Sequence, residues 1–317
     1  MIKLAILMDP IEQIDPNHDS SFAMLLAAQQ KNWALFYFQQ QDLFSQDGKI
    51  QAQARQLTVS TTAPYYQLTE SKIYSLNEFD VVLMRKDPPF DMNYIYTTYL
   101  LEIAEQQGAW IINNPRSIRD ANEKLFTLWF PECCPSTLVS SDKNQIKQFW
   151  QQHGEVILKP LDGMGGKSIF FADQKEKNIH VIIETLTEQN KTPIMVQRYL
   201  PGIKTAGDKR IIMINGKAVD YALQRIPSED DIRGNMAAGA CTQVMLLTER
   251  EQQLCRQIGP VLQQKGLEFV GLDVIDGFVT EINVTSPTGL QELEKHTGIN
   301  YAEEFIEFIS EPLFKVS

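Results

Sequence analysis

The chain has 317 residues, 43% of them hydrophobic and 22% charged, and its formal net charge is −11. This length exceeds the usual size of one domain and predicts two or three packed domains with a sizeable core. The acidic balance argues against a nucleic acid or an anionic membrane surface as the main partner. The amino-terminal apolar run is too short for a signal peptide and no window approaches a membrane span, so we expect a cytoplasmic protein.

The cysteines and histidines lack the spacing of metal or redox sites. Cys133, Cys134, Cys241 and Cys255 form no CxxC pair, and the histidines are scattered along the chain. We therefore expect reduced structural thiols and no zinc site.

The first 120 residues alternate between predicted strands and helices. Apolar runs predict strands at residues 3–8, 34–38, 81–84 and 110–112. Helical periodicity covers residues 20–31 and 94–107, and Asp47-Gly48 marks a hairpin turn. Because strands and helices alternate, we expect a mostly parallel sheet.

A basic pair follows the predicted strand 81–84 in the segment MRKDPPF. Ligands of open α/β sheets bind beyond the carboxyl ends of strands, so Arg85 is placed to meet an anionic substrate. Asp19 and Ser20 follow the first strand in the same way. The alternative is that Pro88-Pro89 merely ends the strand and Arg85 pairs with a surface acid.

The middle of the chain carries a glycine-rich segment, LDGMGGKSIFF, directly after a predicted strand at 155–159. Glycines let backbone amides approach phosphate oxygens, and Lys159 adds positive charge beside them. The segment lacks a full Walker A pattern, because Leu161 stands where glycine is required and a strand follows in place of a helix. An ordinary glycine-rich hairpin turn remains the alternative. Helices are predicted at residues 117–130 and 145–152.

Two arginines lie on predicted strands that follow. A strand at 192–200 precedes a hairpin, 208–214 and 217–226, around Asn215-Gly216. Arg210 and Arg225 lie on this hairpin, where arginine serves either anion recognition or a structural ion pair. Residues 227–242 lack periodicity and predict a lid that carries Arg233 to developing phosphate charge, with a solvated insertion as the alternative.

The segment GLDVIDGFVTEINVTSPTG, residues 271–289, places Asp273, Glu281 and Asn283 in otherwise apolar strand-like sequence. Two carboxylates and an amide oxygen suit Mg²⁺. The alternative is that these side chains lie on the solvated face of a hairpin. A capped helix at 248–265 precedes this segment, and a helix over residues 288–309 is predicted after it.

The register of this hairpin decides whether the three side chains meet. A two-residue turn at Asp276-Gly277 would pair Asp273 with Thr280 and place Asp273 on the face opposite Glu281. We therefore predict a three-residue loop, residues 275–277, with a bulge, which places Asp273 on the Glu281 face.

Motifs in this order resemble the ATP-grasp superfamily and, within it, the bacterial glutathione synthetases. They include LMRKDPPFD, RDANEKLFTLWF, ILKPLDGMGGKSIF, GDKRI, RGNMAAG and FVGLDVIDGFVTEINVTSP, and the resemblance runs along nearly the whole chain. It implies an α/β and α+β fold. Residues 1–120 would form an amino-terminal parallel-sheet domain, and residues 121–200 and 201–317 two ATP-grasp subdomains, the second with the lid at 227–242.

The resemblance also implies site residues, motif by motif. The ATP-binding residues would be Lys124, Lys159, Gly163, Met164, Gly165, Gly166, Gln197, Tyr199, Leu200 and Asp208. The catalytic cations would be Arg210, Arg225 and Arg233. Asp273, Glu281 and Asn283 would hold two Mg²⁺ ions, with Mn²⁺ as a substitute. The substrate-binding residues would be Asp19, Ser20, Arg85, Ser286, Pro287, Thr288 and Gly289.

The implied reaction is ATP-dependent ligation of γ-glutamylcysteine and glycine to glutathione, ADP and phosphate through an acyl phosphate. No nucleophilic side chain is required. The resemblance implies small-molecule substrates, no nucleic acid or membrane partner, and a homo-oligomer. Two alternatives remain: another ATP-grasp ligase, such as one joining D-alanine or adding glutamate to a protein tail, and a nucleotide-binding regulatory protein without turnover. The substrate-side motifs disfavour the first, and the complete metal set disfavours the second.

Overall fold

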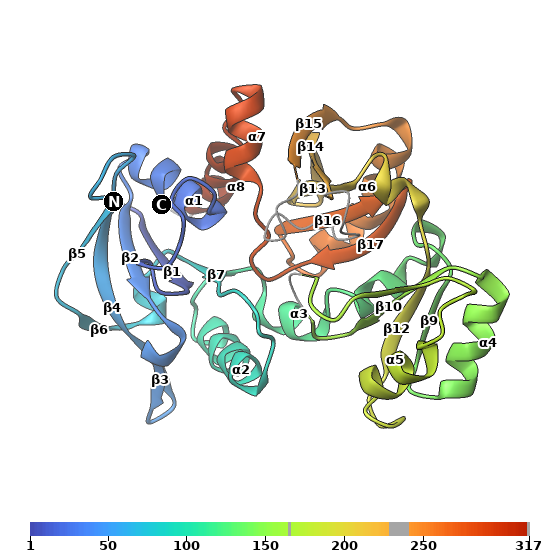
Figure 1. The fold of residues 1–317 in the computed structure, drawn as a ribbon. Helices are drawn as coiled ribbons and strands as arrows, with labels where there is room; N and C mark the ends of the chain where they lie inside the picture. The colour runs from blue at the N-terminus through green and yellow to red at the C-terminus, as the bar shows by residue number, and fades with distance from the viewer. Residues whose placement is uncertain (164–165, 228–240, 316–317) are drawn as a thin grey trace.

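The computed structural model describes all residues except 164–165, 228–240 and 316–317. The described residues form three sheets, of eight, four and five strands in chain order. The eight-stranded sheet lies at one end of the molecule, and the two smaller sheets lie together at the other end (Figure 1). The predicted combination of an amino-terminal α/β part with two α+β parts is confirmed.

The first sheet has the strand order β3-β4-β2-β1-β7-β8, and β5 and β6 also pair with β4. The strands are β1 (Lys3–Met8), β2 (Ala34–Phe38), β3 (Leu43–Gln46), β4 (Lys49–Val59), β5 (Tyr66–Leu68), β6 (Lys72–Ser75), β7 (Val81–Arg85) and β8 (Ile111–Ile112). Strands β2, β1, β7 and β8 run parallel, whereas β3 to β6 pair antiparallel. The predicted parallel pairing is therefore correct at the centre of the sheet, and the predicted hairpin at Asp47-Gly48 is confirmed as the antiparallel pair β3–β4. The antiparallel pairing of β4 with β2, β5 and β6 was not predicted.

Two helices cover the two faces of this sheet. Helix α1 (Ser20–Gln30) lies against Leu4 and Ile6 of β1, and α2 (Met92–Gln106) lies on the side of Ala5 and Leu7. Alternate residues of a strand point to opposite faces, so the apolar run in β1 is buried on both sides. This double burial explains why β1 reads as a continuous apolar segment.

The second sheet is antiparallel, in the order β11-β10-β12-β9. Its strands are β9 (Thr137–Ser140), β10 (Val156–Pro160), β11 (Phe170–Ala172) and β12 (Ile194–Arg198). Helices α4 (Lys143–His153) and α5 (Ile179–Leu186) pack on it through Ile146 and Ile183. The glycine-rich segment connects β10 to β11, which places it at one end of this sheet.

The third sheet has the order β15-β14-β13-β16-β17. Its strands are β13 (Asp208–Ile214), β14 (Lys217–Ile226), β15 (Cys241–Leu246), β16 (Phe269–Ile275) and β17 (Phe278–Asn283), and helix α6 (Glu249–Gln264) follows β15. Thr248 caps α6 through the predicted capping box. The predicted lid, 227–242, ends sooner than expected because β15 begins at Cys241, and most of it lies outside the described residues.

Two predicted helices are interrupted. In place of a helix over 117–130, α3 (Pro115–Asp120) is followed by the 3-10 helix η3 (Leu125–Trp129). The Asn122 side chain accepts hydrogen bonds from the amides of Lys124 and Leu125, and this local turn competes with helix continuation. The closing helix is divided into α7 (Leu290–Thr297) and α8 (Tyr301–Lys315), because Gly298 ends α7 in a left-handed conformation.

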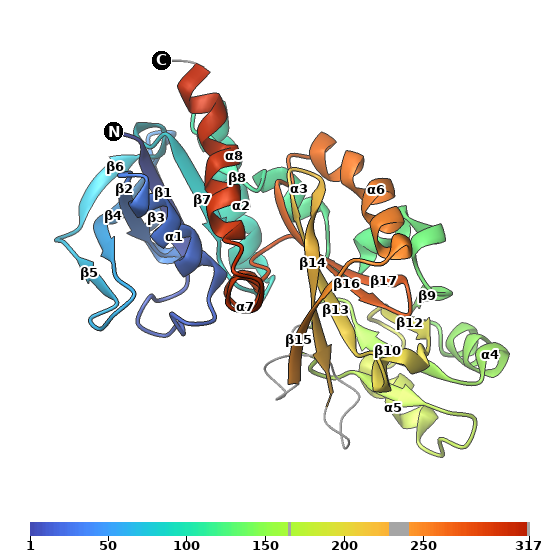
Figure 2. The ribbon, with the colours of Figure 1, turned by 90° about the horizontal axis from the view of Figure 1, so that it is seen from above.

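The two closing helices return to the amino-terminal part of the molecule. Helix α8 packs along α1, as Figures 1 and 2 show from two directions. The Lys31 ammonium lies 3.3 Å from the Glu303 carboxylate and 3.0 Å from that of Glu307. The rings of Phe269 and Phe305 are 5.1 Å apart, which links β16 to α8. Helix α8 thus lies between the first and third sheets.

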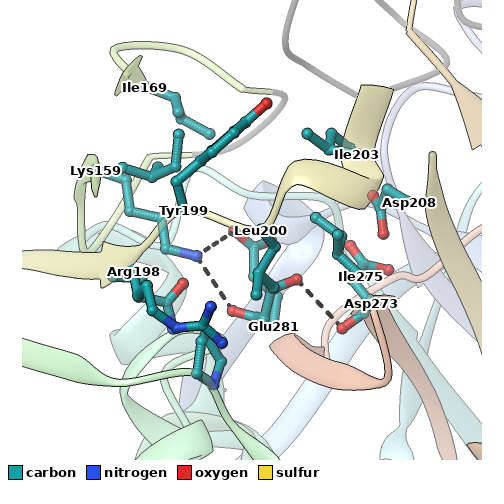
Figure 3. Close-up of a pocket in the computed structure, with 14 residues that line it drawn as sticks. Lys159, Ile169, Arg198, Tyr199, Leu200, Ile203, Asp208, Asp273, Ile275 and Glu281 are labelled. Atoms are coloured by element: carbon teal, nitrogen blue, oxygen red, sulfur yellow. Dashed lines mark hydrogen bonds and ion pairs between the residues drawn. The ribbon is translucent and has the colours of Figure 1, made fainter. Parts of the chain in front are cut away.

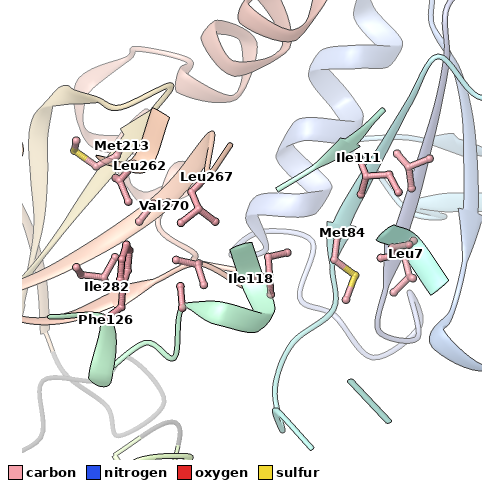
Figure 4. Close-up of a cluster of buried hydrophobic side chains, with 14 of the residues drawn as sticks. Leu7, Met84, Ile111, Ile118, Phe126, Met213, Leu262, Leu267, Val270 and Ile282 are labelled. Atoms are coloured by element: carbon pink, nitrogen blue, oxygen red, sulfur yellow. The ribbon is translucent and has the colours of Figure 1, made fainter. Parts of the chain in front are cut away.

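A hydrophobic cluster also joins these two sheets. It runs from Leu7 and Met84 of the first sheet, past Ile118 of α3, to Leu267 and Val270 at β16 (Figure 4). All of these side chains are buried. The hairpin β16–β17 is therefore packed on a continuous core.

Candidate functional site

The strands of the hairpin β16–β17 carry the three predicted metal ligands. The turn between these strands differs from the prediction. This turn is the two-residue Asp276-Gly277, both with positive φ, and it pairs Ile275 with Phe278. The predicted three-residue loop is wrong. A two-residue turn with positive φ matches the right-handed twist of the strands, and the Asp276 carboxylate is held by the amide of Gly202 at 2.8 Å.

A bulge inside β17 nevertheless brings Asp273 to the face of Glu281. Val274 pairs with Val279, and Asp273 with Glu281, so Thr280 is the extra residue. The Thr280 hydroxyl donates a hydrogen bond to the Asp273 carbonyl at 3.2 Å. Asp273 and Glu281 consequently pair directly across the hairpin. Their shared face is as predicted, although the bulge is in the strand and not in the loop.

Asp273 lies between two buried arginines. The Arg210 guanidinium donates to both its carboxylate oxygens, at 2.5 and 3.0 Å, and Arg225 Nη2 is 3.0 Å from Asp273 Oδ1. Arg225 also binds the carboxylate of Asp208. All four side chains are buried. The four charges neutralise one another across β13, β14 and β16.

The two acids of this network respond differently to burial. Burial opposes ionisation of Asp273, but the charges of Arg210 and Arg225 outweigh it and hold the Asp273 pKa well below its usual range. Burial raises the pKa of Asp208 to about 7, because Arg225 offsets it only in part and the Asp273 charge adds to it. Asp273 therefore remains a carboxylate throughout the neutral range.

Two lysines meet at Glu281. The Nζ atoms of Lys124 and Lys159 are each 3.6 Å from Glu281 Oε1. Lys124 also donates to the carbonyl of Gly163 at 2.5 Å. Lys159 donates to that of Thr280 at 3.2 Å, and Figure 3 shows Lys159 beside Glu281. Burial lowers the pKa of Lys159, and the neighbouring Lys124 acts in the same direction. The two lysines thus share one carboxylate as their counter-ion.

An apolar pocket opens beside this charged group, between the second sheet and the hairpin (Figure 3). Its volume is about 720 Å³ including the open mouth, and its lining includes Ile157, Ile169, Gln197, Tyr199, Leu200, Ile203, Asp208 and Ile275. The Gln197 amide donates to the Thr137 hydroxyl at 3.1 Å, which orients it across the strand pair β12–β9. Apolar walls with a few oriented polar groups are typical of a pocket for a small organic ligand.

A larger polar cleft continues from the pocket. It measures about 1130 Å³ with its mouth, and its lining includes Glu123, Lys124, Gly163, Gly166, Lys167, Arg210, Arg225, Asn283, Thr285, Ser286, Pro287 and Thr288. Asp273 and Glu281 line both the apolar pocket and the polar cleft. The two spaces are therefore parts of one site that meet at the hairpin carboxylates.

Arg85 reaches this region from the carboxyl end of β7. It is buried, and its guanidinium donates to the Ser21 hydroxyl and the Pro287 carbonyl, each at 2.9 Å. The guanidinium also lies 5.1 Å from the centre of the Phe269 ring. Its Nη1 atom has no partner among the described residues. Arg85 thus connects the first sheet to the turn after β17 and retains a free donor.

The other predicted substrate residues cluster where the same turn meets α1. Asp19 caps α1 by accepting from the Phe22 amide, and the Ser20 hydroxyl accepts from the Leu290 amide. Ser286 binds the Asp87 carboxylate, and the Thr288 carbonyl accepts from Arg210 at 3.4 Å. Gly289, with φ 125°, is the residue before α7. Asp19 and Ser20 therefore have structural partners, and neither lines the apolar pocket or the polar cleft.

Some predicted residues cannot be placed, and some lining residues were not predicted. Met164, Gly165 and Arg233 lie outside the described residues. Glu123, Asp87 and Lys167 line the polar cleft without having been assigned a role. The sequence does carry a signal for Glu123, because it directly precedes the predicted ATP-binding residue Lys124 in the run Asn122-Glu123-Lys124.

Neither a cluster of metal-binding side chains nor a membrane-spanning helix is found among the described residues. Within them, no group of three or more histidine, cysteine, aspartate and glutamate side chains is arranged to hold a metal ion. The predicted ligand set has only two carboxylates, since its third member is an amide. None of the helices described is both long and apolar enough to cross a membrane.

Solved structures define the class of fold. The D-cycloserine synthetase DcsG superposes with a TM-score of 0.67 at 14% identity, covering 98% of this chain and 99% of that one. The ATP-grasp ligase PsnB, complexed with minimal precursor, Mg and ADP, gives 0.62 at 14% identity over 96% of both chains. At such identities the likeness shows the fold alone, which is that of the ATP-grasp ligases.

Family models and curated relatives narrow this class. The model for the prokaryotic glutathione synthetase N-terminal domain matches residues 2–119, and that for its ATP-grasp domain matches residues 123–298. The glutathione synthetase of Pseudomonas putida is 50% identical over 313 residues, 98% of both chains, and that of Shewanella oneidensis is 52% identical over 295 residues, 93% of both. The chain belongs to the prokaryotic glutathione synthetase family and is an ATP-dependent ligase of glutathione biosynthesis, as predicted.

Proposed function

We propose that ATP lies across the hairpin β16–β17, with adenine in the apolar pocket and the phosphates in the polar cleft. One observation carries this proposal: Asp273 and Glu281 line both spaces, so a nucleotide that fills the pocket extends its phosphates past the hairpin carboxylates. Lys124 and Lys159 lie at this crossing and would bind the phosphates. Gly163 and Gly166, with Met164 and Gly165, would close over them.

The base and sugar contacts follow from the pocket lining. Gln197, Tyr199 and Leu200 lie on and after β12, where they would meet the adenine edge and face. Asp208 Oδ1 is buried without a hydrogen-bond partner among the described residues. An unpaired buried acceptor is costly, and a ribose hydroxyl would satisfy it. We therefore assign the ribose to Asp208.

Asp273, Glu281 and Asn283 would hold two Mg²⁺ ions, with Mn²⁺ as a substitute. All three offer oxygen, the donor that these cations prefer. The Asn283 amide nitrogen donates to the Gly271 carbonyl at 3.2 Å, so its side-chain oxygen is available, and Glu281 is 22% exposed toward the cleft. When bound, the ions would neutralise phosphate charge and keep the nucleotide oriented.

The ligation itself would proceed through an acyl phosphate. The cysteinyl carboxylate of γ-glutamylcysteine attacks the γ-phosphorus, ADP leaves, and the glycine amine then displaces phosphate from the acyl carbon. Arg210, Arg225 and Arg233 would stabilise the transferred phosphoryl group and the substrate carboxylate. In the structure Arg210 and Arg225 bind Asp273, so substrate binding would divide their donors between that acid and the substrate.

The peptide and glycine would lie on the amino-terminal side of the cleft. Arg85, with its free donor, and the turn of Ser286, Pro287, Thr288 and Gly289 face this side, and Asp19 and Ser20 would support that turn. In this arrangement residues 1–120 contribute to substrate binding, while residues 121–200 and 201–317 enclose the nucleotide.

We also propose that the enzyme works in the cytoplasm as a homo-oligomer. The buried free thiols of Cys133, Cys134 and Cys255 support a reducing compartment. Sedimentation of the purified protein tests the oligomer, and a monomer at working concentration would refute it.

The test of this function is ADP release from Mg-ATP and γ-glutamylcysteine with and without glycine, followed by mass detection of the product. We expect glycine-dependent ADP formation together with glutathione. ADP without glutathione would reassign the substrates to another ligase of this fold, and no ADP at all would refute turnover.

A further inference from the structure

Glu123 is held in the wall of the polar cleft by two contacts with the strand β17 and the residues after it. Its backbone carbonyl accepts from the Ile282 amide at 2.8 Å, and its carboxylate Oε1 accepts from the Thr285 hydroxyl at 2.8 Å. The side chain lines both the polar cleft and a smaller adjoining cavity of about 360 Å³. Glu123 is thus a fixed carboxylate beside the proposed phosphate site.

The carboxylate of Glu123 lacks the basic partner that its neighbours have. Asp273 binds two arginines and Glu281 meets two lysines. Among the described residues, no lysine, arginine or histidine side-chain nitrogen lies within 4.0 Å of a Glu123 carboxylate oxygen. Lys124, Arg210, Glu281 and Tyr94 are the charged or titratable groups close enough to influence it. Burial raises its pKa, and the hydrogen bond from Thr285 opposes this shift.

A carboxylate without a cation in a substrate cleft is complementary to an ammonium group. The acceptor amino acid enters as an ammonium ion, but only the free amine can attack an acyl carbon. We propose that Glu123 binds the ammonium group of the acceptor amino acid and takes its first proton. This inference rests on the acyl-phosphate route proposed above.

The step balances as follows. The ammonium transfers one proton to the Glu123 carboxylate and becomes an amine, whose lone pair forms the C–N bond with the acyl carbon. The C–O bond to phosphate then breaks, and the phosphate leaves with that electron pair. The second proton leaves the nitrogen for the departing phosphate, and the amide keeps the third. Glu123 returns its proton to solvent before the next turnover.

The other ammonium in the reaction belongs to the glutamyl end of γ-glutamylcysteine. It is separated from the cysteinyl carboxyl by several bonds, whereas the acceptor amine must reach the acyl carbon itself. Glu123 precedes Lys124 in the chain and lines the same cleft as Arg210 and Glu281. A carboxylate at the proposed phosphate site therefore suits the attacking amine better than the distant one.

The test uses hydroxylamine, which is uncharged at neutral pH and traps acyl phosphates as hydroxamates without needing a base. In Glu123→Gln we expect kcat/KM for glycine to fall roughly 100-fold, the scale of a lost general base. Hydroxamate formation from Mg-ATP and γ-glutamylcysteine should stay near the wild-type rate. The glycine-dependent rate of the variant should also rise with pH more steeply than that of the wild type, because free amine then replaces ammonium.

Matched variants exclude a structural cause. Glu123→Asp keeps the charge and should recover part of the glycine activity, and Glu70→Gln, at an exposed position, should change nothing. Equal loss of glycine and hydroxylamine activities would overturn the inference, as would a loss confined to kcat/KM for γ-glutamylcysteine. Wild-type enzyme that forms no hydroxamate would refute the acyl-phosphate route and this inference with it.

Discussion

Glu281 is the residue on which the charges of the cleft depend most. The side chains of Lys124 and Lys159 are only 4% and 5% exposed, and Glu281 Oε1 is 3.6 Å from the ammonium of each. Removing the charge of Glu281 would leave both buried lysines without this counter-ion. A buried charge without a counter-ion is strongly unfavourable. The same carboxylate is a proposed metal ligand.

We predict that Glu281→Gln lowers kcat by on the order of 10²–10³-fold, the scale observed when one electrostatic contact to the transition state is removed. The circular dichroism spectrum should remain that of the wild type, because the residue is partly exposed and its strand pairing uses backbone groups. Glu70→Gln is the control for the same chemical change at an exposed position. Turnover near the wild-type rate at saturating Mg²⁺ would contradict the metal assignment.

At this scale the sequence identifies residue types but not their partners. Arg210 and Arg225 stand out as arginines on apolar strands, yet the acids they bind depend on cross-strand register. Arg210 is opposite Asp273 in the pair β13–β16, and Asp208 is opposite Arg225 in the pair β13–β14. Positions of this kind are set by the tertiary pairing of strands distant in sequence, so local patterns do not reveal them.

The strand β16 contributes Asp273 to the site, and it also contributes Gly271, which leaves room for neighbouring groups because it has no side chain. A Cβ atom at Gly271 would lie 2.8 Å from Arg210 Cδ and 2.8 Å from Pro287 Cβ. Gly271 therefore permits Arg210 and the turn after β17 to approach the strand closely. An added methyl group would displace the guanidinium that binds Asp273.

We predict that Gly271→Ala lowers kcat roughly 10–100-fold, since small displacements of positioned groups are costly, and that it lowers stability by about 1–3 kcal/mol through overpacking. Gly298→Ala is the matched control: it strains a left-handed residue, but no atom lies within 4 Å of the added Cβ. That variant should lose stability and keep its kcat. Unchanged kcat in Gly271→Ala would show that Arg210 need not be held there.

Elements with a local signal were predictable, and those determined by competing local contacts were not. The hairpins at Asn215-Gly216 and Asp276-Gly277 and the cap of α6 are present as predicted. The bulge at Thr280 had a sequence signal, because Val279 and Ile282 are both apolar although three residues apart. Both are buried in the structure. A regular strand would place them on opposite faces. The break of the predicted helix near Asn122 required knowledge of its side-chain contacts.

At the scale of the whole molecule, an acidic pair lies where the first and third sheets meet. Burial raises the pKa of Glu268, just before β16, to about 7, and the charge of Glu105 on α2 adds to this. The Asn114 side chain donates to both Glu105 oxygens at 3.2 Å, and the Asn114 amide donates to Gly266 at 2.9 Å. Ionisation of Glu268 therefore destabilises the folded protein at this contact between the sheets.

We predict a pH-dependent gain in stability from Glu268→Gln. The folded protein holds this proton more tightly than the unfolded chain, so wild-type stability should fall as pH rises from about 4.5 to about 7. Above about pH 7 the variant should be more stable by on the order of 1–3 kcal/mol, and below about pH 4.5 the two should be equal. Denaturant unfolding across this range measures the difference. A gain that is independent of pH would contradict the prediction.

The relative placement of the sheets was the least predictable feature. The combination of an α/β part with α+β parts was predictable, because strands and helices alternate early in the chain and hairpins follow later. The return of α8 to α1 depends on apolar faces that are compatible with several partners. Ion pairs such as those of Lys31 with Glu303 and Glu307 only become evident once the helices are adjacent.

The most direct test of the proposed chemistry follows a heavy oxygen isotope placed in the cysteinyl carboxyl of γ-glutamylcysteine. If the hairpin and its cations direct that carboxylate to the γ-phosphorus, one labelled oxygen will appear in the released phosphate and the other will remain in the new amide of glutathione. Glutathione formed together with label-free phosphate would contradict the acyl-phosphate route and the arrangement of the site built on it.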